Sequence, residues 1–296
     1  MKKSVSLLLA GLMLCGALTG CGGNNSTAEN TDSQTAESTT GTSGAIHVVS
    51  REDGSGTRGA FVELTGVEDD NGDNTTVEAE IANRTDAVLT TVAGNEAAIG
   101  YVSLGSLNDT VKAVTVDGVE ATVDNVKSGD YTLSRPFNIA TKGEPTGVAA
   151  DFIGFIMSAG GQAIVGEDYI TVNDNAEAFT SDGSSGHITV GGSSSVSPVM
   201  EQLIEAYKAV NPNAQIDLQT SDSTSGMTGA MDGTFAIGMA SRELKDEEAA
   251  ELTGTAIALD GIAVIVNTAN TVDNLTMDQI RSIYVGETTD WADVAA

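Results

Sequence analysis

Apolar residues recur along the chain in two rhythms from Ile46 onward. Short runs rich in Val, Ile and Ala, bounded by Gly, Ser, Asn and Asp, are typical of strands buried in a sheet. Other stretches repeat an apolar residue every three or four positions, which is the spacing of one helix face. The stretch that begins at Pro198 is an example, because Leu203, Tyr207 and Val210 share a face.

These patterns predict the order of the secondary-structure elements. The predicted strands are residues 46–50, 97–103, 111–116, 136–141, 187–190, 214–219, 235–239 and 256–266. The predicted helices are residues 59–64, 85–92, 148–157, 198–210, 246–252 and 277–283. Alternating strands and helices of these lengths indicate an α/β fold with largely parallel sheets. The length of 296 residues is typical of two domains or of one large domain.

The first 21 residues have the pattern of a secretory signal. Two lysines precede an apolar run from Val5 to Leu18, which is too short for an ordinary membrane span. Leu-Thr-Gly-Cys at residues 18–21 resembles the bacterial lipoprotein signal, in which Cys21 carries the lipid and becomes the first mature residue. The alternative is an ordinary signal peptide with an incidental cysteine. Cys15 would leave with the signal, so the mature protein is expected to hold no disulfide.

Two stretches have the composition of connecting segments. Residues 22–45 are almost entirely small or polar and show no apolar periodicity, which predicts a disordered tether between the lipid and the folded part. Residues 178–186 (AFTSDGSSG, from 178 onward) are rich in Ser and Gly and are the best domain boundary by composition alone.

The charge balance narrows the range of partners. The chain has 13 Lys and Arg against 42 Asp and Glu, and its formal net charge is -29. Removal of Lys2 and Lys3 with the signal leaves 11 basic residues and a charge of about -31 (11 − 42). Such a chain is not expected to bind nucleic acid or an anionic membrane surface. The hydrophobic share of 40% is sufficient for a core, so wholesale disorder is excluded.

Three turns rich in glycine and hydroxyl groups follow predicted strands and open helices. They are Ser50–Gly59 (SREDGSGTRG), Gly191–Pro198 (GGSSSVSP) and Ser221–Gly226 (SDSTSG). The first N–H groups of a helix have no partner inside the helix, and the helix dipole adds partial positive charge there. A helix cap is the ordinary explanation of each turn taken alone. Three such turns in one chain, one of them with Arg51, indicate an anion site.

Other chemistries fit the sequence less well. Gly54–Gly59 matches G-x-G-x-x-G, but the stretch that should end in a ribose-binding carboxylate is the polar loop Glu68–Asp73. That loop could hold calcium, although a solvated loop is the simpler interpretation. His47 and His187 lie at strand starts, no serine lies in a G-x-S-x-G motif, and no mature cysteine remains. A catalytic triad and a zinc site are therefore not expected, and we predict no enzyme activity, no metal and no cofactor.

Longer stretches resemble the phosphate-binding lipoproteins that serve the high-affinity phosphate ABC importer. They are residues 50–59, Gly192–Met200 (GSSSVSPVM) and Asp232–Leu244 (DGTFAIGMASREL), supported by 98–103, 259–264, 274–280 and 289–291. The likeness covers nearly all of residues 46–296. It implies a periplasmic-binding-protein-like fold of type II, in which two α/β lobes are joined by two hinge crossings. Each lobe would be a mostly parallel sheet flanked by helices.

The order of these stretches is circularly permuted relative to the family pattern. In that pattern the GSSSVSP stretch comes first, whereas here it follows the stretch with Arg51. The ends of a compact domain often lie close together, so a fold can survive such a change. The resemblance then implies that residues 46–134 and 267–296 form lobe one and residues 135–266 form lobe two. Residues 178–186 become a loop inside lobe two, and the hinges lie near 134–136 and 266–268.

The resemblance also assigns the residues that bind phosphate. Lobe two would contribute Ser193, Ser194, Ser195, Ser223 and Ser241, and lobe one would contribute Arg51, Asp53, Ser55, Gly56 and Thr57. A dehydrated dianion needs roughly a dozen hydrogen bonds, and neutral N–H and O–H groups supply them locally.

Three of these residues bear on selectivity. Arg51 can bind two oxygens with one fork, and Asp53 can hold Arg51 or accept the proton of monohydrogen phosphate, which sulfate lacks. Many members of the family carry an aspartate where this chain has Ser241. A serine accepts a hydrogen bond there without repelling sulfate.

The resemblance implies a monomer that Cys21 anchors to the outer face of the bacterial cytoplasmic membrane and that delivers inorganic phosphate to ABC permease subunits. Within the same class, the alternatives are a receptor for sulfate, molybdate or arsenate and a surface protein that sequesters phosphate without a transporter. From another class, the alternative is an extracellular phosphatase, which would need a metal cluster or a nucleophile with its base.

Overall fold

The computed structural model describes residues 42–294. The expected signal peptide, Cys21 and most of the expected tether lie outside the described residues. Residues 42–45, which the composition assigned to the tether, already contact the folded part. The N–H of Thr42 donates to Oγ1 of Thr271 at 2.6 Å, and the carbonyl of Gly44 accepts from the N–H of Trp291 at 3.0 Å.

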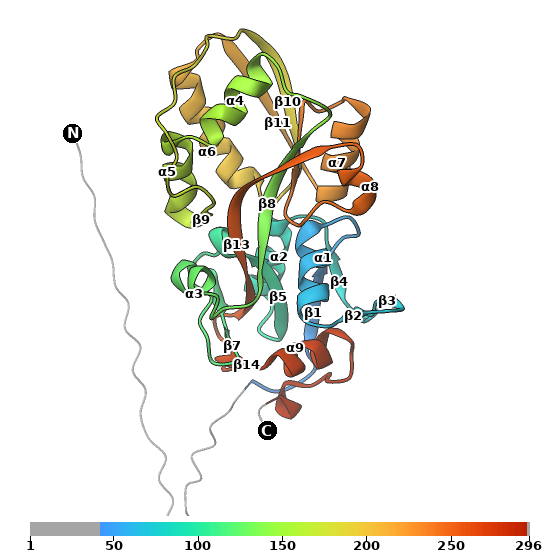
Figure 1. The fold of residues 1–296 in the computed structure, drawn as a ribbon. Helices are drawn as coiled ribbons and strands as arrows, with labels where there is room; N and C mark the ends of the chain where they lie inside the picture. The colour runs from blue at the N-terminus through green and yellow to red at the C-terminus, as the bar shows by residue number, and fades with distance from the viewer. Residues whose placement is uncertain (1–41, 295–296) are drawn as a thin grey trace, which may run out of the picture. The chain divides into compact units, whose positions relative to one another are not determined.

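A ten-stranded sheet runs through the folded part, in the order β11-β10-β12-β8-β13-β5-β1-β4, and β6 and β9 add to it by pairing with β13 (Figure 1). Its strands are β1 (His47–Arg51), β4 (Glu80–Ala82), β5 (Ala98–Ser103), β6 (Val111–Ala113), β8 (Ser134–Thr141), β9 (Ile170–Thr171), β10 (Gly186–Ser193), β11 (Ala214–Ser221), β12 (Ile237–Ala240) and β13 (Thr253–Asn267). Two short pairs lie outside it, β2 (Glu68–Asp69) with β3 (Gly72–Asp73) and β7 (Thr115–Val116) with β14 (Asn274–Leu275).

Helices cover both faces of this sheet. They are α1 (Gly56–Leu64), α2 (Thr85–Gly94), α3 (Val123–Ser128), α4 (Val148–Ile156), α5 (Ala159–Asp168), α6 (Ser197–Val210), α7 (Ser223–Asp232), α8 (Asp246–Ala249) and α9 (Met277–Tyr284). In the upper half of Figure 1, α4, α5 and α6 lie on one side of β10 and β11, and α7 and α8 lie on the other. Every predicted strand and helix has a counterpart, although the expected strand 111–116 is divided between β6 and β7.

The direction of strand pairing divides the sheet into three parts. At one end β10 pairs in parallel with β11 and β12, and at the other end β1 pairs in parallel with β4 and β5. Between them β8 and β13 run antiparallel to each other and to their neighbours β12 and β5. The α/β class is therefore confirmed, and the parallel pairing lies in the outer strands while the centre is antiparallel.

Apolar side chains gather in separate cores at the two ends of the sheet, and these cores define the two lobes. In lobe one Phe61 stacks on Tyr101 with ring centroids 3.9 Å apart, and Tyr284 meets Phe61 edge-on. In lobe two Phe152 and Tyr207 lie 5.0 Å apart in a core built from α4, α6 and the inner strands, to which α5 adds Val165. The two-lobed fold expected from the resemblance is therefore present.

The strands β8 and β13 connect the lobes. Residues 253–261 of β13 pair with β8, whereas residues 262–266 pair with β5. Ile262, Val264 and Val266 pack in the core of lobe one, so the expected boundary at residue 266 needs correction. The apolar run of β13 is long enough to serve both cores, and the passage between them lies near Asp260.

Both ends of the described chain lie in lobe one. Ala45 and Asp290 form an antiparallel bridge, and the N–H of Ile46 donates to the carbonyl of Thr289 at 2.8 Å. The Ser- and Gly-rich residues 178–186 lie in lobe two, where Asp151 accepts from the hydroxyl of Ser181 at 2.6 Å. Within residues 42–294 no single helix is long and apolar enough to cross a membrane, and only the bent pair of α4 and α5 meets that test by length and composition.

Candidate functional site

Four helices begin at the cleft between the lobes. In lobe one α1 follows β1 and α2 follows β4, and in lobe two α6 follows β10 and α7 follows β11. Because the carboxyl ends of parallel strands meet at one edge of a sheet, the helices that follow these strands begin close together. Their amino ends therefore bring N–H groups and partial positive charge to one region.

Hydroxyl groups from both lobes meet in this region, and we call them the hydroxyl cluster: Thr57 from lobe one and Ser193, Ser194, Ser195, Ser223 and Ser241 from lobe two. All of them are buried. Oγ1 of Thr57 lies 2.9 Å from Oγ of Ser195, and Oγ of Ser193 donates to Oγ of Ser241 at 2.9 Å. The N–H of Ser241 donates to Oγ of Ser223 at 3.0 Å. The structure thus brings together hydroxyls that are up to 184 positions apart in the chain (241 − 57).

Arg51 is the charged member of the site and is only 2% exposed. Its Nε and Nη2 donate to the two carboxylate oxygens of Glu52, each at 2.8 Å. Nη2 also donates to Oγ of Ser194 at 3.1 Å, and Nη1 donates to Oγ1 of Thr85 at 3.3 Å. One edge of the guanidinium is therefore held by Glu52, and the edge formed by Nη1 and Nη2 faces the hydroxyl cluster.

Asp53 does not join the cluster, which corrects the expectation from the sequence. Its side chain is 99% exposed and accepts from Nη1 of Arg58 at 3.0 Å. Gly54 follows Asp53 with a φ of 87°, a left-handed conformation that glycine adopts without strain. Glu52, which the sequence analysis did not select, holds Arg51 in place of Asp53.

Two expected residues contribute through the backbone and the helix start. Ser55 is buried and caps α1, with its hydroxyl accepting from the N–H of Arg58 at 3.3 Å. A Cβ on Gly56 would lie 2.8 Å from Oγ of Ser241 and 3.0 Å from its carbonyl carbon, so only glycine permits this approach of lobe one to lobe two. The approach brings the start of α1 directly against the cluster.

Thr85, the first residue of α2, was missed. Its Oγ1 lies 3.2 Å from Oγ of Ser194 and 3.3 Å from Oγ of Ser195, and it accepts from Arg51. The preceding strand β4 has only three residues and exposes half of Ile81, so it gives almost no apolar pattern. The available signal was the polar turn Asn83-Arg84 directly before a predicted helix.

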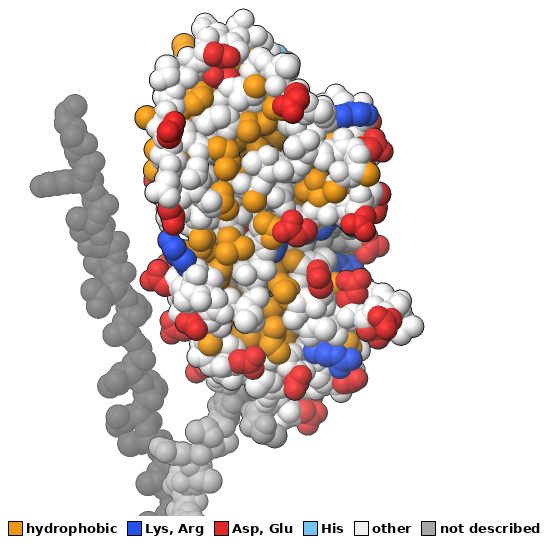
Figure 2. Space-filling view, viewed as in Figure 1, with side chains coloured by type: hydrophobic (Ala, Val, Ile, Leu, Met, Phe, Trp, Pro, Cys, Tyr) orange, Lys and Arg blue, Asp and Glu red, His pale blue; other side chains and the backbone are white. Residues whose placement is uncertain are grey.

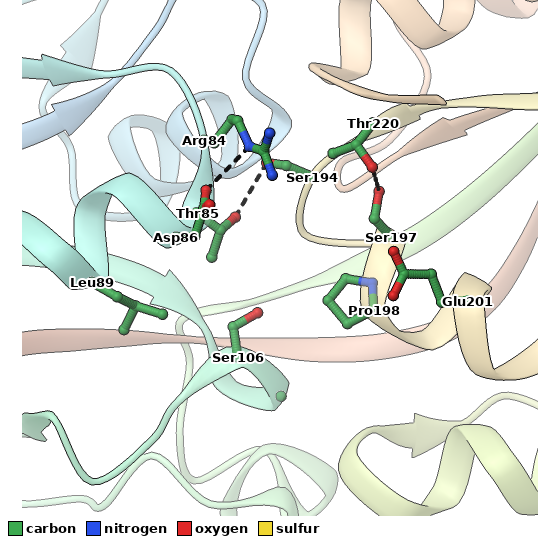
Figure 3. A pocket seen from close by; sticks show the side chains of 11 residues that line it. Arg84, Thr85, Asp86, Leu89, Ser106, Ser194, Ser197, Pro198, Glu201 and Thr220 are labelled. Carbon is green, nitrogen blue, oxygen red and sulfur yellow. Dashed lines mark hydrogen bonds and ion pairs between the residues drawn. The ribbon is translucent and has the colours of Figure 1, made fainter. Parts of the chain in front are cut away.

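A pocket of about 330 Å³ opens beside the cluster (Figure 3). Thr85 and Ser194 lie on its wall, with Arg84 and Asp86 on the lobe-one side and Ser197 and Glu201 on the lobe-two side. Arg84 is paired with Asp86 at 3.2 Å and is half exposed. Of the hydroxyl cluster, Ser194 is the member that lines this pocket.

Arginines around the cleft are each paired with a carboxylate. The pairs are Arg51–Glu52, Arg58–Asp53, Arg84–Asp86, Arg135–Asp260 and Arg242–Glu248. Acidic side chains greatly outnumber basic ones on the face seen in Figure 2. An anion at the cluster would therefore be held by short-range hydrogen bonds and helix ends rather than by long-range attraction.

The pair Arg135–Asp260 lies at the passage between the lobes, on paired positions of β8 and β13. Nη2 of Arg135 donates to Oδ2 of Asp260 at 3.0 Å, and both side chains are almost completely buried. Burial raises the pKa of Asp260 to about 6, against the attraction of Arg135, which lowers that pKa. Burial likewise lowers the pKa of Arg135 to about 10. Desolvation thus outweighs the mutual attraction for both partners.

Within residues 42–294 no cluster of three or more His, Cys, Asp and Glu could hold a metal ion. His47 contacts Glu80 at 2.8 Å and His187 contacts Asp217 at 2.9 Å, so each lies on its own lobe away from the cluster.

Comparisons with known proteins agree with this geometry. A family model described as a PBP superfamily domain matches residues 25–159 and 177–296. The phosphate-binding protein PstS 2 of Streptococcus agalactiae serotype V is 46% identical over 301 residues, which cover 99% of this chain and 98% of that protein. The protein of the same name from Streptococcus pneumoniae serotype 4 is 44% identical over 297 residues, 98% of this chain and 99% of that protein.

The chain also matches a crystal structure of a phosphate-binding protein. It is the phosphate-binding protein of a phosphate ABC transporter from Streptococcus pneumoniae TIGR4, and it matches with a TM-score of 0.69 and 46% sequence identity. The match covers 85% of this chain and all of that chain. These relatives are named for binding rather than for catalysis.

Proposed function

We propose that this chain, which belongs to the PBP superfamily, is an extracellular receptor that binds inorganic phosphate between its lobes and delivers it to an ABC importer. The observation that carries the proposal is the meeting of Arg51 with buried hydroxyls of both lobes at one spot beside four helix ends. The naming of the close relatives as phosphate-binding proteins supports the choice of ligand.

The chemistry of the cluster suits a tetrahedral dianion. Each hydroxyl can turn its proton from a neighbouring hydroxyl to a ligand oxygen, and the Nη1 and Nη2 edge of Arg51 can contact two oxygens at once. We propose that Ser193, Ser194, Ser195, Ser223, Ser241, Ser55, Gly56 and Thr57 bind phosphate with Arg51 through their N–H and O–H groups. Glu52 would keep Arg51 in the orientation that this requires.

Lobe movement would admit and enclose the ligand. Oγ1 of Thr57 and Oγ of Ser195 belong to different lobes and lie 2.9 Å apart, which is the spacing of a closed cleft. We propose that the lobes open by a hinge in β8 and β13 near Arg135 and Asp260, where the two strands pass from one core to the other. Opening would separate Thr57 from Ser195 and expose Arg51 to solvent.

The cellular setting is proposed from the sequence. Cys21 would carry the lipid that anchors the protein to the outer face of the cytoplasmic membrane, and the residues after it would form the tether. The circular permutation is supported by the adjacent ends of the described chain, since Ala45 and Asp290 are paired. Joining the ends there and opening the chain within residues 178–186 would give the usual order. The protein would act as a monomer on the permease.

A second candidate is a receptor for another oxyanion, and one observation favours it. The carboxylate of Asp53 points to solvent and Ser241 lies in the cluster, so neither position presents a charge that would repel sulfate. Sulfate, molybdate or arsenate could then compete with phosphate.

Titration calorimetry of the mature protein with each anion separates these candidates. We expect heat of binding with phosphate at micromolar protein and weaker heat with sulfate. No heat with phosphate would rule out the proposed function, and tighter binding of sulfate or molybdate would favour the second candidate. Release of phosphate from a generic ester by the pure protein would instead indicate a phosphatase.

A further inference from the structure

We propose that Thr85 is a further ligand-binding residue, whose hydroxyl donates to an oxygen of the bound anion and lets α2 take part in the site. This inference rests on the proposed function, because it concerns the same phosphate. It adds to the site a residue that lies outside the three glycine- and hydroxyl-rich turns.

The position of Thr85 among the other groups is the main argument. Its Oγ1 lies 3.3 Å from Nη1 of Arg51, 3.2 Å from Oγ of Ser194 and 3.3 Å from Oγ of Ser195. An oxyanion that contacts both the Nη1 and Nη2 edge of Arg51 and the hydroxyl of Ser194 must therefore lie within reach of Thr85. Among the described residues, no other lobe-one hydroxyl is hydrogen-bonded both to Arg51 and to the cluster.

The hydroxyl of Thr85 makes only long hydrogen bonds to the neighbouring serines. Hydrogen bonds between hydroxyls are usually about 2.7 to 2.8 Å long, and both contacts to the serines are longer than 3 Å. Arg51 donates to Oγ1, so the proton of Thr85 is the group that remains to be given to an acceptor. An anionic oxygen is a stronger acceptor than either serine and would take that proton in a shorter bond.

The start of α2 favours the same ligand. Arg84, which precedes the helix, makes no side-chain cap hydrogen bond, whereas Ser55 caps α1 and Asp222 caps α7. In the first turn of α2 the side chain of Asp86 accepts from the N–H of Ala87 at 3.1 Å, whereas Arg84 adds no cap. The helix dipole adds partial positive charge where Thr85 meets Arg51. Figure 3 shows Thr85 on the wall of the pocket through which a solute would reach Ser194.

The test compares two substitutions of Thr85, one that removes the hydroxyl and one that removes the methyl group. Thr85→Val keeps the shape and removes the hydroxyl, and Thr85→Ser keeps the hydroxyl and removes the methyl group. Inorganic phosphate is titrated into the full mature protein and both variants. We expect Thr85→Val to weaken binding by about tenfold or more, because a hydrogen bond to a charged partner is lost, and Thr85→Ser to stay within about threefold of wild type.

The outcomes are distinguishable from failure of the proposed function. If wild type binds phosphate and Thr85→Val binds within about twofold of Thr85→Ser, the inference about Thr85 is overturned while the proposed function stands. If wild type binds no phosphate, the proposed function itself fails. Thermal unfolding of the ligand-free variants checks that both are folded.

A crystal structure of the phosphate complex separates direct binding from an effect through Arg51. We expect a ligand oxygen within about 3 Å of Oγ1 of Thr85. A distance above about 4 Å would show that Thr85 only positions Arg51 and would overturn the inference.

Discussion

Two buried arginines lie near the interlobe cleft, and their surroundings are different. Arg51 ends β1 and donates hydrogen bonds to Glu52, Thr85 and Ser194. Arg135 lies on β8 and donates one hydrogen bond, to Asp260. Among the described residues, Nε and Nη1 of Arg135 and Oδ1 of Asp260 are buried without a partner in the protein.

The two buried guanidinium groups therefore have different consequences for the protein. The Nη1 and Nη2 edge of Arg51 faces hydroxyls, which in the proposed function would be replaced by ligand oxygens, so that its burial would prepare the binding of an anion. Arg135 faces a carboxylate fixed on the neighbouring strand, so its buried charge joins β8 to β13. Loss of one partner of such a pair destabilises the fold, because the other charge stays buried. Replacement of both partners by apolar residues often makes the protein more stable.

The largest effect is expected from breaking the pair at Asp260. Asp260→Leu leaves the charge of Arg135 buried and unpaired, so the free energy of unfolding should fall by about 3–5 kcal/mol. Arg135→Met combined with Asp260→Leu should recover this loss and add about 1–4 kcal/mol. Urea denaturation measures both. A double variant no more stable than Asp260→Leu would contradict the view that desolvation dominates this pair.

The pH dependence of stability gives a second test of the same pair. The pKa of Asp260 is raised to about 6 in the folded protein, from 3.8. A raised pKa means that the carboxyl group stabilises the fold fully below about pH 4 and that this contribution is lost as the pH rises to about 6. The loss is at most about 3 kcal/mol, since one pKa unit corresponds to about 1.4 kcal/mol.

The double variant provides the control for this measurement. Other carboxyl groups titrate alike in both proteins, so the difference in unfolding free energy isolates the pair. The advantage of the double variant over wild type should grow between pH 4 and pH 7. A difference that is constant over this range would mean that the pKa of Asp260 is not raised.

A smaller effect, measured on ligand binding, is expected at Arg51. Arg51→Met removes the fork and leaves the carboxylate of Glu52 unpaired beside the anion, so phosphate affinity should fall by at least about 2 kcal/mol, roughly 30-fold. Arg51→Lys keeps the charge but cannot contact Glu52, Thr85 and Ser194 together, so its affinity should be intermediate. Calorimetry with phosphate measures both variants. An unchanged affinity of Arg51→Met would mean that Arg51 does not contact the ligand.

The sequence was sufficient to predict most of the cluster. The stretches with Arg51, Ser193–Ser195 and Ser223 each join a strand to a helix, and parallel strands bring such turns to one edge of the sheet. To predict that these turns meet, only the order of strands and helices is required, and the apolar pattern indicated that order. The residue Ser241 came from the resemblance, because the turn after β12 opens no regular helix of its own.

Orientation and weakly patterned elements could not be predicted. Whether Glu52 or Asp53 faces Arg51 depends on the turn at Gly54 and on the competing pair with Arg58, which neighbouring residues do not reveal. Thr85 was missed because β4 is short and half exposed. Asp260 was the one clue to the buried pair, since it interrupts an apolar run, but its partner Arg135 lies 125 positions away.

The smallest effect concerns selectivity, and it compares the two positions where a carboxylate was expected. Ser241→Asp places a charge in the cluster, which repels sulfate and accepts the proton of monohydrogen phosphate. We expect the ratio of phosphate to sulfate affinity to rise by about tenfold, equivalent to about 1.4 kcal/mol. Asp53→Asn is the matched control, because it removes a carboxylate that points to solvent and should leave the ratio unchanged. Competition calorimetry measures the ratio for both variants. A loss of selectivity in Asp53→Asn would mean that Asp53 turns inward when phosphate binds, and that the turn at Gly54, rather than Ser241, sets the choice of anion.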